Sequence, residues 1–112
     1  MDDATRIRCE ELAKVMKALG HPTRSFLALT LAEGSRCVCE LTEMVGVDVS
    51  TVSKHLSILR EAGLVYSEKI GLQVHYHLTS KCVLDFYNCV ESVVRHDVAQ
   101  KASILETNEQ ES

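Results

Sequence analysis

Two short helical segments joined by a tight, glycine-containing turn restrict the fold of this chain more than any other feature. We predict helices over residues 38–44 and 50–62. Gly46 can adopt the left-handed conformation that ends a helix, and Asp48 or Ser50 can cap the next one. Two helices joined in this way form a helix-turn-helix.

Two further helices precede the helix-turn-helix. Apolar residues at helical spacing predict a first helix over residues 11–19, and Gly20 ends it. Pro22 occupies a position in the first turn of a second helix, where proline is well tolerated, and this helix stops at Gly34. The N-terminal part of the chain is therefore predicted to be helical.

The period of the apolar residues along the sequence changes after the helix-turn-helix. β-Branched and aromatic residues over residues 64–70 and 73–78 flank a glycine turn and predict a β-hairpin, which we interpret as a wing. A last helix is predicted over residues 80–104. The order of elements predicts a mainly helical α+β fold, a winged helix-turn-helix with a β-hairpin wing.

The last helix carries two adjoining apolar stripes, which together are wider than one small core requires. We therefore expect the terminal helices to form a dimer interface. The stripes are Cys82-Phe86-Cys89-Val93 and Val83-Tyr87-Val90-Val94.

Length and composition favour a single ordered domain. The 112 residues, 46% of them hydrophobic, suit one domain over residues 1–106 with a polar C-terminal tail over residues 107–112. No stretch is long and apolar enough to span a membrane, and the acidic start is unlike a signal peptide, so we expect a cytoplasmic protein without membrane contact. Five cysteines in such a protein indicate reduced thiols and not a disulfide framework.

The net charge of −4 does not by itself favour nucleic-acid binding, because affinity for DNA depends largely on basic residues. The distribution of charge allows it, since acidic residues cluster near both ends and basic residues lie in the middle. We expect a local basic face on an acidic body. The residues that could build it are Arg36, Lys54, His55, Arg60 and Lys69.

The second helix of the helix-turn-helix runs directly into the wing. Residues 50–65 read S-T-V-S-K-H-L-S-I-L-R-E-A-G-L-V. This run resembles the recognition helix of ArsR/SmtB repressors, and the resemblance extends over residues 12–94, including His-Pro-Thr-Arg at residues 21–24 and Tyr76 in the wing. The resemblance implies a dimeric, DNA-binding transcriptional repressor and not an enzyme.

The outward face of this helix is small and polar, which lets a helix enter the major groove and bond to phosphates or base edges. Lys54 adds a charged donor, and His55 could donate to a phosphate. A two-fold dimer would read an inverted repeat in double-stranded operator DNA. The predicted DNA contacts are Ser50, Thr51, Ser53, Lys54, His55, Ser57 and, in the wing, Lys69.

A pair of cysteines stands at the start of the first helix of the helix-turn-helix. The sequence Cys37-Val38-Cys39-Glu40-Leu41 resembles the motif with which arsenic-sensing and cadmium/lead-sensing members of the family bind their inducers. Thiolates suit soft ions, and the helix N-terminus together with Arg36 should favour the thiolate. The resemblance implies that As(III) or Sb(III), or alternatively Cd(II) or Pb(II), releases the operator; DNA binding itself needs no cofactor.

The spacing of Cys37 and Cys39 predicts how sensing would work. Residues two apart on a regular helix point to nearly opposite sides, whereas in an extended segment they share one face. We therefore expect the segment to unwind when both sulfurs hold one ion. The hypothesis is that this distortion displaces the recognition helix, the ion favouring the distorted state by its differential affinity.

The third ligand departs from the arsenic-sensing pattern, because Thr42 stands where the familiar form has a third cysteine. Cys9 is the leading candidate, since cadmium/lead members complete a similar site with N-terminal cysteines, usually from the other subunit. A small cytosolic thiol is the alternative. Cys82 and Cys89 share an apolar stripe, so we interpret them as packing residues of the interface.

Two other functions fit the sequence poorly. The zinc or cobalt site that some family members build across their last helices is broken here, because Tyr87 and Ala99 replace required ligands. Cys89 and Arg95 have the spacing of a phosphatase loop, but the residues between them lack glycine and continue a helical stripe.

A thiol-redox repressor with the same DNA-binding fold is the remaining alternative. In it, Cys37 with Cys39, or Cys82 with Cys89, would oxidise without any metal. The sequence leaves this alternative open.

Overall fold

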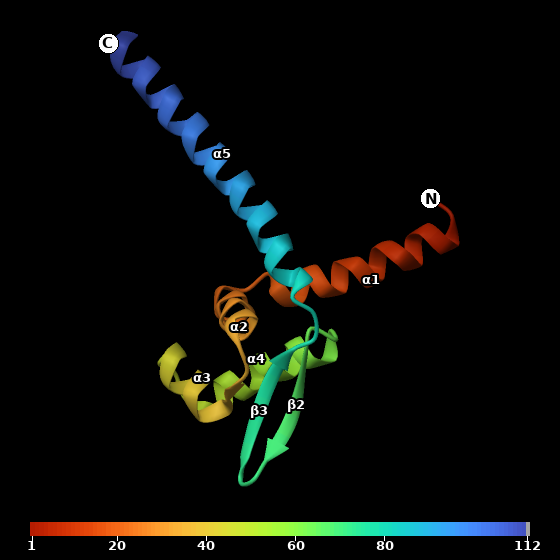
Figure 1. Cartoon of the computed structure of the whole chain (residues 1–112). Helices are drawn as coiled ribbons and strands as arrows, with labels where there is room; N and C mark the ends of the chain where they lie inside the picture. Colours follow the sequence, from red (N-terminus) through yellow and green to blue (C-terminus); the bar gives the residue numbers. More distant parts are fainter. Residues whose placement is uncertain (112) are drawn as a thin grey trace. The chain divides into compact units, whose positions relative to one another are not determined.

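The computed structural model describes the backbone of residues 1–111 and the side chains of residues 1–104. The chain forms two compact units, residues 1–81 and residues 82–112. In the first unit the elements are α1 (Asp3–Leu19), α2 (Pro22–Glu33), β1 (Arg36–Cys37), α3 (Val38–Val45), α4 (Val49–Glu61), β2 (Val65–Ile70) and β3 (Gln73–Leu78) (Figure 1). The second unit is the single helix α5 (Cys82–Glu111).

Helix α1 begins eight residues before the predicted start at Glu11. Asp2 caps it, because its carboxylate accepts a hydrogen bond of 2.7 Å from a backbone N–H of the first turn. Arg6 pairs with Asp3 at 3.0 Å and with Glu10 at 3.7 Å along the same face. The predicted start was wrong because capping and ion pairs, and not apolar periodicity, support these first turns.

The boundaries of α2 are confirmed. His21 caps the helix through its ring Nδ1, which accepts a hydrogen bond of 3.1 Å from the backbone N–H of Thr23. Pro22 is the first helical residue, where its missing N–H costs no helix bond. The helix ends before Gly34.

Helices α3 and α4 form the predicted helix-turn-helix. Gly46 adopts the left-handed conformation (φ 82°), and its N–H bonds to a carbonyl of α3. Asp48 caps α4, which settles the choice that the sequence left between Asp48 and Ser50. The buried face of α4 meets α2 and α3 in the core. The largest fully buried side chains are Leu27, Leu41, Val52, Leu56 and Leu59.

The wing is a sheet with three antiparallel strands in the order β1-β3-β2. Strands β2 and β3 are the predicted hairpin, and Tyr76 on β3 is buried. Strand β1 was not predicted. It pairs Arg36 with Tyr76 and Cys37 with His75, so the cysteine that begins the helix-turn-helix is also joined to the wing.

Helix α5 extends past the predicted end at residue 104 to Glu111. The predicted polar tail, residues 107–112, lies outside the residues whose side chains are described. Much of the apolar surface of α5 is exposed in the single chain, including the side chains of Phe86, Val90, Val93 and Val94. No helix within the described part of the chain is long and apolar enough to cross a membrane.

Candidate thiol site and nucleic-acid interface

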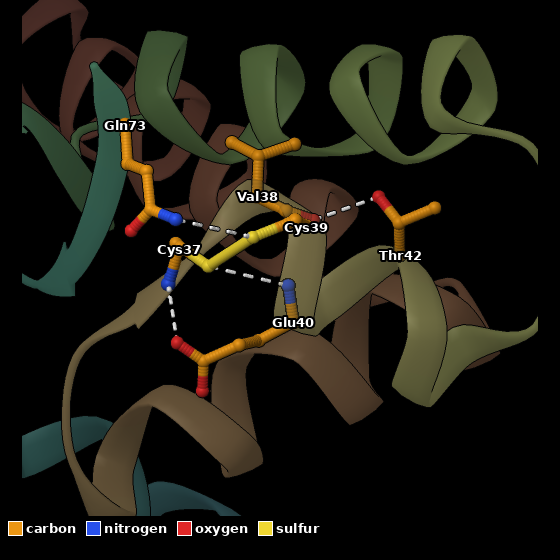
Figure 2. The surroundings of a disulfide bond; sticks show 6 residues. All are labelled: Cys37, Val38, Cys39, Glu40, Thr42 and Gln73. Carbon is orange, nitrogen blue, oxygen red and sulfur yellow. Dashed lines mark hydrogen bonds between the residues drawn. A yellow bond between two sulfur atoms is a disulfide. The ribbon is translucent and has the colours of Figure 1, made fainter.

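Cys37 and Cys39 meet at the junction of β1 and α3. Cys37 ends β1 and is the N-cap of α3, and Cys39 lies in the first helical turn. Their Cα atoms are 5.4 Å apart, and a disulfide joins their Sγ atoms (Figure 2). The expectation that all five cysteines are reduced is therefore wrong for this pair. Cys9, Cys82 and Cys89 take part in no disulfide among the described residues.

Helix α3 is intact around the joined sulfurs because Cys37 and Glu40 form a capping box. The Sγ atom of Cys37 accepts a hydrogen bond from the backbone N–H of Glu40 at 3.3 Å. In return, the backbone N–H of Cys37 donates to Oε1 of Glu40 at 3.4 Å (Figure 2). The Cys37 sulfur thus accepts the capping hydrogen bond that a hydroxyl or carboxylate oxygen usually accepts at a helix N-terminus.

The premise that the two sulfurs cannot meet while α3 stays helical was wrong, whereas unwinding on ion binding stays a prediction. It treated Cys37 and Cys39 as two residues of one regular helix. Cys37 instead has extended backbone angles (φ −76°, ψ 158°), and an N-cap side chain folds back over the first turn, where Cys39 lies. The two sulfurs therefore reach one point while α3 keeps its helical form.

Arg36 directs its guanidinium to the end of α2. Its Nη1 donates to the backbone carbonyls of Gly34 and Ser35 at 3.1 and 3.0 Å, and its Nη2 lies 3.9 Å from a carboxylate oxygen of Glu33. The guanidinium thus covers the end of α2. In the reduced protein, the N-terminus of α3 and the N–H of Glu40 would be the groups that stabilise negative charge on the Cys37 sulfur.

The structure brings two of the three predicted ligands together. Thr42, which replaces the familiar third cysteine, donates its hydroxyl to the carbonyl of Val38 at 2.7 Å (Figure 2). Cys9 is exposed on α1, and no group of three or more His, Cys, Asp or Glu side chains suited to a metal occurs among the described residues. The role of Cys9 from a second subunit stays a prediction.

An open pocket of about 430 Å³ adjoins the cysteine pair. One side is the start of α4, with Val49 and Ser53, and the other is the wing, with Leu72, Gln73 and Val74. The side chain of Gln73 points its Nε2 at the Sγ of Cys39, 4.0 Å away (Figure 2). Sequence reasoning missed the wing residues of this pocket, because only the pairing of β1 with β3 brings the wing beside the cysteines.

The predicted DNA-contact residues of α4 lie on or beside its exposed face. Ser50, Ser53 and Lys54 are exposed, Thr51 and Ser57 are half-buried, and Lys69 is exposed on the wing. The hydroxyl groups of Ser50 and Thr51 both donate to the carboxylate of Asp48. These bonds lower the pKa of Asp48 to about 2. The two hydroxyls therefore use their protons on the capping carboxylate of Asp48 and keep only acceptor capacity toward a ligand.

His55 differs from the other predicted DNA contacts because its ring turns toward α2. The Nδ1 atom of His55 lies 3.2 Å from Nη1 of Arg24, and its ring centroid lies 4.5 Å from that of His21. Arg24 also donates to the carbonyl of Ala18 at 2.6 Å. Burial lowers the pKa of His55, and the positive charges of His21 and Arg24 lower it further. His55 is thus a packing and hydrogen-bonding residue of the fold, and its predicted phosphate contact stays a prediction.

The residues that suggested a phosphatase loop form none. Cys89 and Arg95 both lie within the continuous helix α5, where a phosphate cannot be wrapped by backbone N–H groups. Arg95 pairs with Glu91 at 3.2 Å, one helical turn away. Cys89 is exposed in the single chain.

The helix-turn-helix continues into a three-stranded wing and carries a cysteine pair on the cap of its first helix. This arrangement defines a winged helix-turn-helix protein with a thiol site inside the helix-turn-helix. Residues 21–67 match the sequence profile of the arsR family of bacterial regulatory proteins.

The chain is 35% identical over 86 residues to the biofilm growth-associated repressor of Xylella fastidiosa (strain Temecula1), covering 77% of this chain and 75% of that protein. It is 32% identical over 102 residues to the arsenical resistance operon repressor of Escherichia coli (strain K12), covering 80% of this chain and 87% of that protein.

The fold also matches a solved structure, the homodimeric winged helix-turn-helix DNA-binding domain of a possible ArsR-family transcriptional regulator from Mycobacterium bovis. The TM-score is 0.77 at 26% identity, over 88% of this chain and 91% of that one. Together with the sequence relatives, this match leads to one conclusion. The chain belongs to the arsR family and is a winged helix-turn-helix transcriptional regulator.

Proposed function

We propose that this protein is a homodimeric, cytoplasmic transcriptional repressor that releases its operator when As(III) or Sb(III) binds the reduced thiols of Cys37 and Cys39. The observation that carries the proposal is the convergence of the two sulfurs on the cap of α3, the first helix of the DNA-reading unit. Soft thiophilic ions suit such a dithiol. The similarity to the Escherichia coli arsenical resistance operon repressor supports the choice of arsenic.

The exposed apolar face of α5 supports dimerisation. Val93 and Val94 are 67% and 55% exposed in the single chain, and Val98 is 59% exposed. Exposed apolar residues repeating along one helix are typical of an interaction surface. The homodimeric state of the Mycobacterium bovis domain supports the same arrangement here. A two-fold dimer would place its two α4 helices in successive major grooves of an inverted repeat.

Ligand capture would act on the hydrogen bonds that the two sulfurs make. An ion bound to both would draw the Cys37 sulfur from the N–H of Glu40, weakening the cap of α3. It would also compete with the contact between Gln73 and the Cys39 sulfur, which connects α3 to the wing. The repressor would release DNA because the ion binds the altered arrangement of α3 and wing more tightly.

The number of sulfur ligands limits which ions can act as the inducer. Cys37 and Cys39 supply two ligands, so a trivalent arsenic or antimony needs a third, which we assign to Cys9 of the second subunit or to a small thiol. Cd(II) and Pb(II) are the alternative inducers, because thiolates bind these soft ions as well.

Oxidation of the same pair is a second candidate trigger. The disulfide between Cys37 and Cys39 favours it, because it shows that the two sulfurs reach bonding position without loss of α3. In this reaction the two thiols give up two electrons and two protons to hydrogen peroxide, the S–S bond forms, the O–O bond breaks and two waters leave. The metal-binding and redox triggers thus use the same atoms and differ in the chemical that acts on them.

The test of the proposed function is operator release by different inducers. A duplex selected from a random pool by the reduced protein serves as operator, and fluorescence anisotropy reports its release. Arsenite, antimonite, Cd(II), Pb(II), Zn(II) and hydrogen peroxide are compared for the wild type, Cys37→Ser, Cys39→Ser and Cys9→Ser. We expect arsenite and antimonite to release DNA from the wild type and to fail with either serine variant of the pair.

The matched control is the double variant Cys82→Ser/Cys89→Ser, which should respond as the wild type does. Release by peroxide alone would replace ion sensing by the redox trigger. A normal arsenite response of Cys9→Ser would remove Cys9 from the site and leave the small thiol as third ligand.

A further inference from the structure

Three half-buried side chains join the start of α2 to the middle of α4, the helix that carries most of the predicted DNA contacts. Nη1 of Arg24 lies 3.2 Å from Nδ1 of His55, and the ring centroids of His55 and His21 are 4.5 Å apart. A second bond holds Arg24, because its Nε donates to the carbonyl of Ala18 at 2.6 Å. We call His21, Arg24 and His55 the histidine–arginine cluster.

The hydrogen bonds of the histidine–arginine cluster determine the protonation state of both rings. Arginine has donors and no acceptor, so Nδ1 of His55 must carry a lone pair to accept from Arg24. Nδ1 of His21 accepts from the backbone N–H of Thr23 at 3.1 Å, so it must carry a lone pair as well. A protonated imidazole donates at both nitrogens. Each ring can therefore keep its bond only while it is neutral.

A proton taken up by the cluster would meet mainly positive charge. The charges that act on the His55 ring are those of His21 and Arg24. In the described part of the chain neither ring has a carboxylate oxygen within 4.0 Å, and Glu40 of α3 and Glu68 of β2 are directed to other groups. The charged residues that line a pocket with Arg24 are Lys14 and Lys17 of α1 and Glu61 of α4.

We propose that the histidine–arginine cluster positions α4 for operator binding only while both rings are neutral, so that proton uptake in mildly acidic solution releases DNA. This inference rests on the DNA-binding part of the proposed function and uses no property of the cysteine pair. The three residues are positioning residues, because their contacts lie between α2 and α4, whereas Ser53 and Lys54 are exposed for the operator. Protonation adds one proton to Nδ1 of each ring and breaks no covalent bond.

The effect on α4 follows from the two hydrogen bonds that protonation removes. A protonated His55 no longer accepts from Arg24, and two positive groups then face each other across the contact. A protonated His21 loses its capping bond at the start of α2 and adds a third positive charge beside them. Repulsion would move α4 away from α2, together with Lys54. Since the operator binds the neutral arrangement, DNA and protons would oppose each other's binding.

The sign of this pH response differs from that of ordinary electrostatics. A protein gains positive charge as the pH falls, and attraction to phosphates then strengthens DNA binding. The cluster predicts that operator binding weakens instead, because α4 loses its position. A duplex of scrambled sequence, whose binding depends mainly on charge, should show the ordinary sign.

Operator affinity of the reduced full chain is measured by fluorescence anisotropy between about pH 7.5 and about pH 5.5 at constant ionic strength. We expect the affinity of the wild type to fall at least about tenfold over this range, while binding to the scrambled duplex holds or increases. Circular dichroism should show an unchanged helix content at the pH of release. Operator binding that stays constant or strengthens at about pH 5.5, or release that coincides with loss of helix, would overturn the inference.

Two substitutions keep the hydrogen bonds and remove the titration. His55→Gln offers Arg24 an amide oxygen as acceptor, and His21→Asn supplies a strong N-cap. We expect the double variant His21→Asn/His55→Gln to bind the operator within about threefold of the wild type at about pH 7.5 and to keep that affinity at about pH 5.5. His96→Gln, on the exposed part of α5, is the control and should lose the operator as the wild type does. A wild-type loss of affinity in the double variant would overturn the inference.

The cysteine variants separate this inference from the proposed inducer. Cys37→Ser/Cys39→Ser should keep the wild-type pH profile, because no contact of the cluster involves either cysteine. If the wild type responds to arsenite and not to pH, only this inference fails. If it responds to pH and not to arsenite, only the proposed inducer fails. A protein that selects no duplex from the random pool contradicts both.

Discussion

Cys37 has two separate roles in this account, as the cap of α3 and as a thiol. Its sulfur accepts the N–H of Glu40 and is also joined to Cys39. Serine is among the strongest N-cap residues, and alanine is among the weakest. The two roles can therefore be separated by substitution.

We predict that Cys37→Ala lowers the free energy of unfolding by about 1 kcal/mol under reducing conditions, because the N–H of Glu40 loses its acceptor. Cys37→Ser should stay close to the wild type, since its hydroxyl caps the helix. Urea unfolding followed by circular dichroism measures both. Equal loss in the two variants would show that the sulfur contributes packing and not capping.

His55 predicts a pH dependence of stability. Its folded-state pKa lies below the ordinary value of 6.5, because the half-buried ring is partly desolvated and the positive charges of His21 and Arg24 lie beside it. The unfolded chain therefore binds more protons at this residue below about pH 7. The stabilisation that His55 provides is present above its unfolded pKa and is lost as the pH falls through its folded pKa.

We predict that the wild type becomes less stable between about pH 7 and about pH 5, and that His55→Gln reduces this slope. Chemical unfolding at a series of pH values measures it. His96→Gln, a variant of an exposed histidine on α5, is the control and should keep the wild-type slope. A His55→Gln slope identical to the wild type would contradict the role of His55.

At this scale the sequence predicted which two cysteines lie together but not how they meet. Helical-wheel reasoning assigns every residue the same backbone, whereas Cys37 is an N-cap with extended angles. The sequence also could not predict that the ring of His55 turns toward α2. Its contact with Arg24 spans 31 positions, and no local pattern reports such a contact.

At the scale of elements, α4 and the wing each carry an exposed lysine. Lys54 on α4 and Lys69 on β2 are both exposed. A lysine that contacts a phosphate releases counterions when DNA binds, and its loss changes the salt dependence of binding more than the sequence preference.

We predict that Lys54→Gln and Lys69→Gln each weaken operator binding and each lower the slope of log affinity against log salt by about two per dimer. Binding isotherms between about 0.05 and about 0.2 M salt measure the slope. Arg95→Gln on α5 is the control and should leave the slope unchanged. A wild-type slope in Lys69→Gln would remove the wing from the DNA interface.

The sequence predicted the helix-turn-helix and the hairpin because periodicity, Gly46 and the caps all act locally. It could not predict β1, since two residues are too short to show an alternating pattern. This short strand matters for function because it places Cys37 opposite His75 and so joins the thiol site to the wing.

The dimer belongs to the scale of the whole molecule. The sequence predicted it from the width of the apolar face of α5, and the exposure of that face in the single chain supports the prediction. A charge placed within a buried apolar interface is costly because it loses its hydration.

We predict that Val93→Glu shifts the protein toward monomer and weakens operator binding by at least about tenfold, because two linked half-sites are no longer read together. Sedimentation velocity over a range of protein concentrations measures the shift. Val93→Ala, which keeps the face apolar, should remain dimeric. A fully dimeric Val93→Glu protein would place the interface elsewhere.

The most direct test of the central claim is a titration of arsenite into the preformed complex of operator and protein, with the wild type and Cys37→Ser/Cys39→Ser compared side by side. The double variant keeps the cap of α3 and should bind the operator within about twofold of the wild type. The account predicts that arsenite releases DNA from the wild type and leaves the double variant bound at every concentration. Equal release from both proteins would contradict it.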